Sequence, residues 1–259
     1  MKPLFVIIFF LLPYVIFGSG KKESISLSSM QEQYSSGYFV TKPFNNRLIV
    51  IGISNPMLRR QEEIDAAKED AARKVAMFYG IHGKIESVTG TNDNFFESNH
   101  IYNAELRYDS NYERFIEELT YDPAKDVLIT NEGIFIRFQH ETTVTSFNYN
   151  ARLINNRPTW TRNQDKPEIE GYAVSVGFAR NQRRLKDTIN KSIEDAISRM
   201  IEDQSTAVNT RDVSSSGQGA SSSIHTISEG KLNNFQIIEI WIEPGTRFVY
   251  TLAVARVER

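Results

Sequence analysis

The 259-residue sequence contains no cysteine, which excludes disulfides, thiolate metal sites and thiol nucleophiles. It also excludes the lipid-modified cysteine at which a bacterial lipoprotein signal ends. Thirty basic and 32 acidic residues nearly cancel to a formal charge of −2, so the chain as a whole has no attraction for nucleic acid. We therefore expect no nucleic-acid partner and no covalent lipid anchor through cysteine.

Long apolar runs are also absent, apart from the one at the N-terminus. Leu4–Phe17 is almost wholly apolar, follows a basic residue and is followed by the small residues Gly18–Gly20. This layout predicts a secretory signal peptide, cleaved after Gly20 or alternatively after Gly18. A membrane-spanning helix needs about 20 apolar residues, so an uncleaved inner-membrane anchor is the alternative. We expect export to the periplasm or outer membrane of a bacterium.

No group of residues forms a catalytic or metal-binding motif. The histidines are dispersed and lack ligand spacing; they are His82, His100, His140 and His225. The acid pairs Glu69–Asp70 and Glu194–Asp195 are adjacent helix positions, which point about 100° apart and do not converge. The sequence therefore predicts no catalytic residue, no cofactor and no metal, and the protein is not expected to be an enzyme.

What the sequence does contain is an internal repeat at an offset of 125 residues. Without a gap, Gly52 aligns with Gly177, and Glu69–Ala71 aligns with Glu194–Ala196. In each copy a short apolar run leads into the amphipathic pattern of a helix. A fixed self-match of this kind predicts two similar structural units.

The predicted architecture is α+β, with two tandem modules, each a small, mainly antiparallel sheet with one long amphipathic helix packed on one face. In chain order the boundaries are a signal peptide at 1–20, a polar leader at 21–46, a first module at 47–150, a linker at 151–170 and a second module at 171–259. The leader is polar and is expected to be loosely docked, and the segment that joins the modules has little apolar periodicity.

Apolar periodicity also predicts the individual elements. The expected strands are 48–53, 84–88, 127–130 and 134–138 in the first module, and 172–178, 235–242 and 247–254 in the second. The expected helices are about 60–79 and 185–203, with a short one at 112–119. Two polar stretches, 89–108 and the Ser/Gly-rich 214–223, are predicted to be loops.

Three sequence features, in this order, are similar to those of a known protein family. They are the strand Val50–Gly52, the Ala-rich helix segment 66–72 with its Glu-Asp-Ala, and a hairpin containing Trp241, Gly245 and Phe248–Tyr250. This order resembles the twenty-kilodalton bacterial outer-membrane lipoprotein (Lpp-twenty type) family, and is similar to the N-terminal domain of flagellar assembly protein T. The resemblance implies a cell-envelope protein tied to outer-membrane or flagellar structures, without catalytic residues. The chain departs from the family in lacking the lipidation cysteine and in being duplicated.

Two groups of residues are candidates for contact with a ligand or partner. The first lies between the strand and the helix of each unit, where helix N-terminal amides could help to bind an anion, and consists of Arg59, Arg60, Arg183 and Arg184. Ordinary surface charge is the alternative interpretation. The second is aromatic and would mark a partner surface if exposed, or pack the linker on a module; it consists of Tyr149, Trp160 and Tyr172.

The sequence thus favours an exported, non-catalytic structural or assembly protein of the cell envelope. It would act through contacts with envelope proteins or with further copies of itself, using surfaces or sheet edges. The alternative is a periplasmic protein, or enzyme, with a small-ligand site between the modules. A peptidoglycan-binding protein is a further alternative, with Trp160 and Trp241 as the tryptophans available for stacking on sugars.

Overall fold

The computed structural model describes residues 29–257 except 44–46, 92–96, 145–148, 150, 163–164, 205–207 and 217–218. Within 88–102 and 208–225 it describes the backbone alone. The predicted signal peptide and residues 21–28 of the predicted leader therefore lie outside the described residues. In the part of the chain that is described, no helix is long and apolar enough to cross a membrane.

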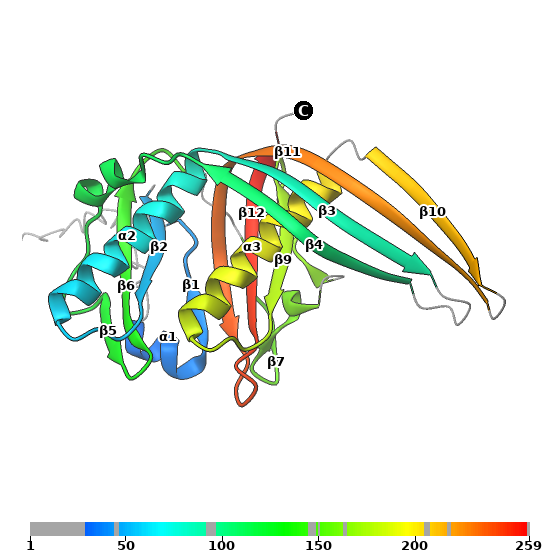
Figure 1. Ribbon diagram of the computed structural model, residues 1–259. Coiled ribbons are helices and arrows are strands. Elements are labelled where there is room, and N and C mark those ends of the chain that lie inside the picture. The colour runs from blue at the N-terminus through cyan, green and yellow to red at the C-terminus, as the bar shows by residue number, and fades with distance from the viewer. Residues whose placement is uncertain are drawn as a thin grey trace, which may run out of the picture.

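The strands form two main sheets that lie side by side behind two long helices (Figure 1). The smaller sheet has the order β2 (Arg47–Ser54), β6 (Gly133–Glu141), β5 (Val127–Thr130). The larger has the order β4 (Glu97–Tyr108), β3 (Ile81–Thr91), β11 (Gly219–Ile242), β12 (Val249–Val257), β9 (Ala173–Ala179). Two more strands pair with β11, namely β1 (Tyr38–Val40) and β10 (Val208–Ser216). A short ribbon joins β7 (Leu153–Ile154) to β8 (Arg157–Pro158), and all these pairings are antiparallel.

Each long helix covers one part of the strand layer. α2 (Arg60–Tyr79) packs on β2 and β6, and α3 (Leu185–Gln204) packs on β9, β12 and β11. The shorter helices are α1 (Met30–Ser36) and the 3-10 segments η1 (Tyr112–Glu118) and η2 (Thr159–Thr161). Small and branched side chains recur every three or four residues on the buried helix faces, so helix and sheet approach closely. The predicted mixed fold, its mainly antiparallel strands and both long helices are confirmed.

The strands do not divide into one sheet for each half of the sequence. β3 and β4 follow α2, yet β3 pairs with β11 from Ile81 opposite Leu232 to Thr91 opposite Ser222. β11 can do this because it is 24 residues long, and its second part pairs with β12. The hairpin after α2 therefore extends the sheet on which α3 packs.

β4, β3, the first part of β11 and β10 form a four-stranded ribbon, here called the arm, that extends beyond the helices (Figure 1). The prediction of loops at 89–108 and 214–223 is wrong, because most of these residues lie in paired strands. Residues 89–108 and 214–223 are mainly polar, so apolar alternation does not mark these strands, which pair through backbone hydrogen bonds.

The predicted leader contributes to the core in its second part. Met30 of α1 and Phe39 of β1 are buried, and β1 pairs with the C-terminal part of β11. Ser29 caps α1 through a reciprocal contact with Glu32, so the helix has a defined start. The expectation of a loosely docked segment is therefore wrong for these residues. α1 has seven residues and β1 has three, so both are too short to show a periodicity.

The predicted linker is also packed rather than free. It contributes β7, β8 and η2, and Trp160 is fully buried against Val176, Ile238 and Leu252 on the face of the larger sheet away from α3. Residues 151–170 therefore contribute to the core, because one large indole provides a buried area that apolar periodicity does not indicate.

Candidate functional site

The outer edge of β2 is closed by side chains from α2. The backbone N–H of Ile53 donates to Asp70 at 2.9 Å. The Lys74 ammonium donates to the carbonyl of Ile51 and to Asp70, each at 2.7 Å. Both charged side chains are buried, and burial lowers the pKa of Lys74 although Asp70 opposes that change. An extended partner strand cannot reach backbone groups that already have these partners.

The edge of β9 has the matching backbone-to-aspartate contact, made by residues 125 positions later. Phe178 N–H donates to Asp195 at 2.8 Å, and Arg199 pairs with Asp195 at 2.8 Å. A Cβ on Gly177 would collide with the backbone oxygen of Ser192, just as one on Gly52 would collide with that of Ala67. The aligned residues therefore do the same work at both places: a glycine lets the helix approach and an aspartate binds the strand edge.

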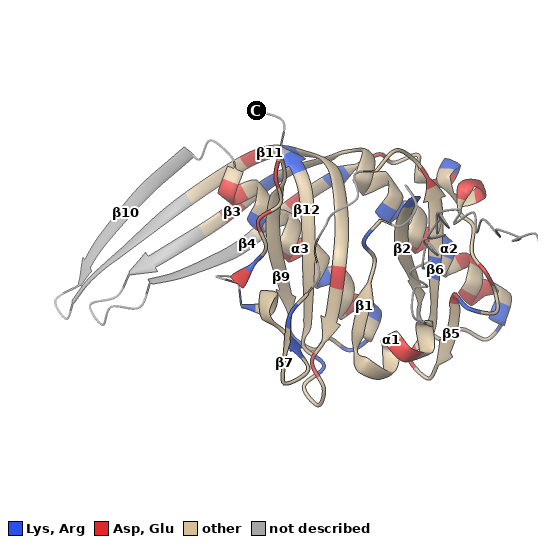
Figure 2. Ribbon diagram, turned by 180° about the vertical axis from the view of Figure 1, so that it is seen from behind, with Lys and Arg blue, Asp and Glu red and all other residues tan. Residues whose placement is uncertain are grey.

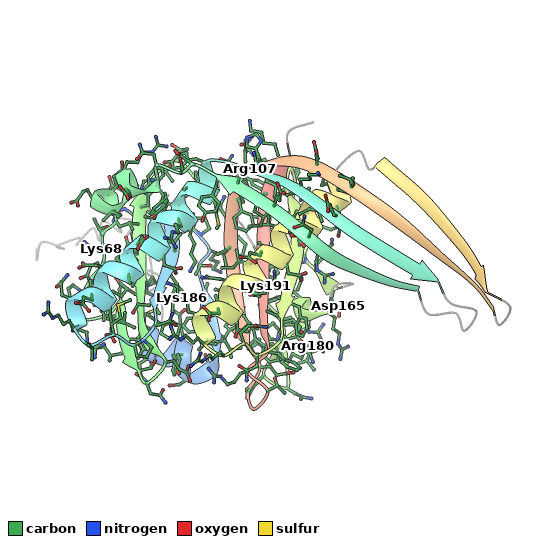
Figure 3. All side chains as sticks on the ribbon, viewed as in Figure 1. Lys68, Arg107, Asp165, Arg180, Lys186 and Lys191 are labelled. Carbon is green, nitrogen blue, oxygen red and sulfur yellow. The ribbon has the colours of Figure 1, made fainter. Side chains whose placement is uncertain are left out.

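The two closures differ in what surrounds them. Asp70 also lies 3.7 Å from Lys186 and 3.5 Å from Asn190, both on α3. Figure 3 places Lys186 between the two helices. The hollow there is about 180 Å³, and each of its charged residues, Asp70, Arg73, Lys74 and Glu194, already has an ion-pair partner. Small-molecule sites are typically 300–1,000 Å³, so this geometry does not favour the predicted ligand site between modules.

Two further carboxylates are buried at the hairpins of the two sheets, Asp126 beside β5 and Glu239 in β11. Asp126 lies opposite Arg137, which donates to it at 2.7 Å, and both are buried. Glu239 lies opposite Leu252 in β12, so an apolar residue takes the place of the arginine. Its partner is Trp160, whose indole N–H donates to it at 2.6 Å. Burial raises the pKa of Glu239 to about 7, against the hydrogen bonds from its neighbours and the charge of Lys42.

The three predicted partner aromatics belong to one apolar cluster on this face of the sheet instead of forming an exposed surface. Trp160 is fully buried, and Tyr149 and Tyr172 are partly buried in the same cluster. Burial, followed by the charge of Glu239, raises the pKa of Tyr149. The interpretation that they pack the linker is confirmed for Trp160, and its exposure to a partner is excluded. Trp241 is also buried, so neither indole offers a face for stacking on a sugar.

The four predicted arginines lie in two connections at one end of the molecule, β2–α2 and β9–α3, where both long helices begin. All four are exposed. Arg59 and Arg60 pair with Glu62 and Glu63 in the first turn of their own helix. In the described residues, no carboxylate lies within ion-pair distance of Arg183 or Arg184. Arg183 and Arg184 are therefore available to bind an anion, whereas Arg59 and Arg60 are already paired with glutamates.

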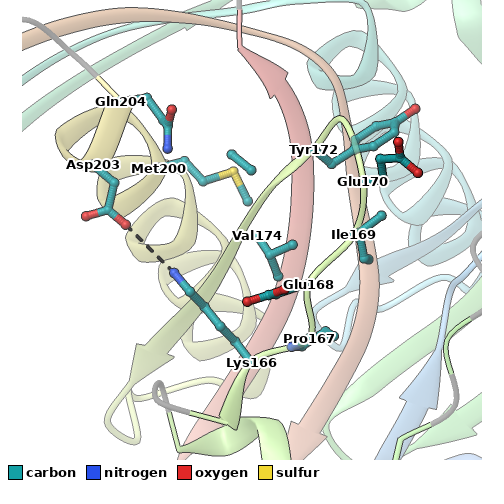
Figure 4. Close-up of a pocket in the computed structure, with 11 residues that line it drawn as sticks. Lys166, Pro167, Glu168, Ile169, Glu170, Tyr172, Val174, Met200, Asp203 and Gln204 are labelled. Carbon is teal, nitrogen blue, oxygen red and sulfur yellow. Dashed lines mark ion pairs between the residues drawn. The ribbon is translucent and has the colours of Figure 1, made fainter.

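A hollow of about 580 Å³ lies between 166–174 and the end of α3 (Figure 4). The ion pair between Lys166 and Asp203 spans it at 4.0 Å, and Glu168, Glu170 and Met200 complete much of its lining. Its polar groups are mainly carboxylates, with no nucleophile and base in contact. It has the chemistry of a surface groove rather than of a reaction site.

His140 is the buried histidine of the described residues. Tyr79 lies 2.9 Å from its Nε2, and Glu118 lies 3.4 Å from its Nδ1. Burial lowers the pKa of His140, so the ring is neutral near pH 7. Phe115 stacks on Tyr79 and holds it there, which is a packing role between η1 and the sheet. Among the described residues no cluster of three or more His, Asp or Glu could hold a metal ion.

The arm offers edges of another kind. β4 pairs only with β3, and β10 pairs only with β11, so each has one side without a strand neighbour among the described residues. At the root of the arm, basic and acidic side chains alternate on one face, as Lys84, Glu86, Glu105 and Arg107 show. Seen from behind, both signs are interspersed over this region (Figure 2).

Comparisons with family models, with curated proteins and with solved structures found no match to this chain.

Proposed function

We propose that this chain is an exported, non-catalytic component of the bacterial cell envelope, built from two tandem strand–helix modules and working in assembly through protein–protein contacts. Its partners are envelope proteins, with further copies of itself and outer-membrane or flagellar components as the classes that the sequence resemblance suggests. The observation that carries the proposal is the contrast between closed and open sheet edges in one molecule.

Open edges favour association because their backbone donors and acceptors are already aligned for another strand. In β2 and β9, Asp70 and Asp195 accept hydrogen bonds from backbone N–H groups of the edge, which are then not free to bind another strand. β4 and β10 belong to a ribbon that extends away from the helices, where another chain has access to them. A partner strand added to either edge would continue the larger sheet.

The matched contacts support the modular part of the proposal. Residues at the 125-residue offset make the same strand-edge hydrogen bond and the same close approach of helix to sheet. A duplication that keeps such contacts multiplies one stable unit, while the segments between the matched residues are free to diverge. The arm is built from such segments, which follow each long helix.

Shortening the arm tests the proposal. Ser87 is joined to Ile101 through Asn-Gly, and Val208 is joined to Ile227 in the same way, because these residues lie opposite each other. Two-residue Asn-Gly turns suit antiparallel hairpins. We expect the shortened chain to fold, since the buried clusters lie outside the removed segments. In-cell crosslinking should lose its adducts with partner proteins or with second copies.

The matched control replaces Gly217–Gln218 with Asn-Gly and keeps the arm at full length. It should crosslink like the parent chain, and both variants should unfold at the parent's temperature. Adducts that persist unchanged after shortening would remove the arm as the contact element. A chain that stays monomeric and retrieves no envelope partner in its own cell would overturn the proposed function altogether.

A further inference from the structure

A feature outside the arm lies at the end of the molecule where both long helices begin. Five segments meet there, and they are called the basal end: 55–60, 129–133, 152–162 with Asp165, 180–184 and 243–247. Contacts show that they are neighbours. Arg247 of the β11–β12 turn pairs with Glu132 of the β5–β6 turn at 2.9 Å. Arg157 beside the β7–β8 turn lies 3.7 Å from Glu243.

The basal end holds most of the large apolar side chains that the described residues leave exposed. They are Met57, Leu58, Ile129, Leu153 and Ile154, whereas only Tyr79 and Ile227 lie elsewhere. Leu58 is 103% exposed, so it protrudes from its loop without any packing contact. Exposing such groups is unfavourable in water, and a cluster of them at one end indicates a surface that is covered in use.

The same segments are strongly basic. Their nine arginines are Arg59, Arg60, Arg152, Arg157, Arg162, Arg180, Arg183, Arg184 and Arg247, against the three acids Glu132, Asp165 and Glu243. The chain as a whole carries −2, so positive charge is concentrated here. Glu62, Glu63 and Asp187 in the first helical turns offset part of it. Figure 3 shows Arg180 at this end of the molecule, and Figure 2 shows basic segments beside β7.

We propose that the basal end binds the surface of an anionic lipid bilayer. Arginine forks bind phosphate oxygens in pairs, and the apolar tips enter the boundary between headgroups and acyl chains. The arrangement favours lipid over a protein partner because the apolar groups sit on separate turns. A protein interface has one continuous apolar core with a polar rim, whereas a fluid bilayer adapts to isolated tips.

This surface would orient the molecule as well as hold it. The arm departs from the other end of the larger sheet and runs to the side of the helices, so a chain bound by its basal end holds the root of the arm on the side away from the lipid (Figure 1). The inference is independent of the proposed arm contacts, since the two regions share no residues.

The test is co-sedimentation of the chain, purified after export, with vesicles of phosphatidylglycerol and phosphatidylcholine or of phosphatidylcholine alone. We expect binding to the anionic vesicles that weakens as salt rises. The variant R180A/R183A/R184A should bind about a hundredfold less tightly, because each basic residue near an anionic surface contributes about a factor of five. M57S/L58S should weaken binding at every salt concentration.

Matched controls carry the same changes elsewhere. R107A/R114A/K191A removes three exposed basic residues outside the basal end, and I227S removes an exposed apolar one; both should bind like the parent. In L58W, lipids brominated near the headgroup should quench the new indole. Equal binding to both vesicle types, binding unaffected by the basal variants, or an indole that is not quenched would each overturn the proposal. Capture of an acidic protein in place of vesicles would also overturn it.

Discussion

The first and second strand–helix pairs use the same residues in different surroundings. Asp70 and Lys74 close the edge of β2 in a buried site, where Lys186 and Asn190 of the second pair reach them. Asp195 and Arg199 close the edge of β9, and Arg199 remains partly exposed. Both strand–helix pairs therefore have the aspartate that binds the strand edge. How much this contact contributes to stability depends on whether another element buries it.

A valine at either matched glycine gives the largest expected effect. In Gly52→Val and Gly177→Val the new side chain collides with the backbone of the helix, which cannot rotate away. We expect neither variant to yield folded chain, because overpacking against backbone has no relaxed alternative. Circular dichroism of the soluble fraction measures this. If only one of the two prevents folding, the pairs are not equivalent.

Removing a carboxylate from a buried ion pair gives the next effect. Asp126→Asn leaves Arg137 buried without its counter-charge, and Asp70→Asn does the same to Lys74. Each should lose about 3–5 kcal/mol in the free energy of unfolding. Urea denaturation at pH 7 measures the change. A loss under about 1 kcal/mol at Asp70 would show that the cover from α3 does not desolvate the pair.

Glu239→Gln should act in the opposite direction, with an effect that depends on pH. The folded pKa of Glu239 is raised from 4.5 to about 7, so between these values the folded chain holds a proton that the unfolded chain releases. Stability of the parent therefore falls as pH rises from 4.5 to about 7. At about 1.4 kcal/mol for each pKa unit, the glutamine variant should gain about 3 kcal/mol at pH 8 and almost nothing at pH 4.5.

That prediction also separates the two buried carboxylates, because the same change at Asp126 should be destabilising near neutral pH. The measurement is thermal or urea unfolding of both variants across this pH range. A constant difference between Glu239→Gln and its parent would show that the carboxyl titrates as it does in water.

The smallest expected effect is that of Asp195→Asn. Arg199 is partly exposed, so water can solvate it once the counter-charge is gone. The asparagine oxygen still accepts the Phe178 N–H, and we expect a loss of about 1 kcal/mol or less. Urea denaturation alongside Asp70→Asn measures the contrast between the pairs. Equal losses for the two variants would contradict the role assigned to burial.

The sequence predicted the long helices, because their apolar residues recur with a helical period. The helix predicted at 60–79 begins and ends as expected, because its alanines and Val75 recur on one face. The repeated Glu-Asp-Ala drew attention to Asp70 and Asp195, and a solvated helix face or pairing with a residue four positions on was expected of them. Both make that i,i+4 pair, and their hydrogen bonds to strand edges were not predicted. The backbone acceptor of a side chain depends on tertiary packing, which a spacing does not reveal.

The features that the sequence did not predict depend on contacts between segments that are far apart in the chain. The arm is polar, and β3 meets β11 across more than a hundred residues, so no local pattern marked it. Trp160 reaches Glu239 in the same non-local way. A signal was present in Glu239 itself, which interrupts the apolar run Ile237–Ile242 and therefore needs a buried partner. The predicted arginine pairs lie at the basal end. Its exposed apolar side chains could not be predicted from the sequence, because exposure depends on the tertiary structure.

The most direct test of the central claim compares open and closed edges in the living cell. A photoreactive amino acid is placed at Ser98 of β4 or Ser215 of β10, and at Asn55 or Asn181 next to the closed edges of β2 and β9. We predict adducts with envelope proteins or second copies from the two arm positions, and few from the others. Adducts from Asn55 and Asn181 with none from the arm would contradict the account.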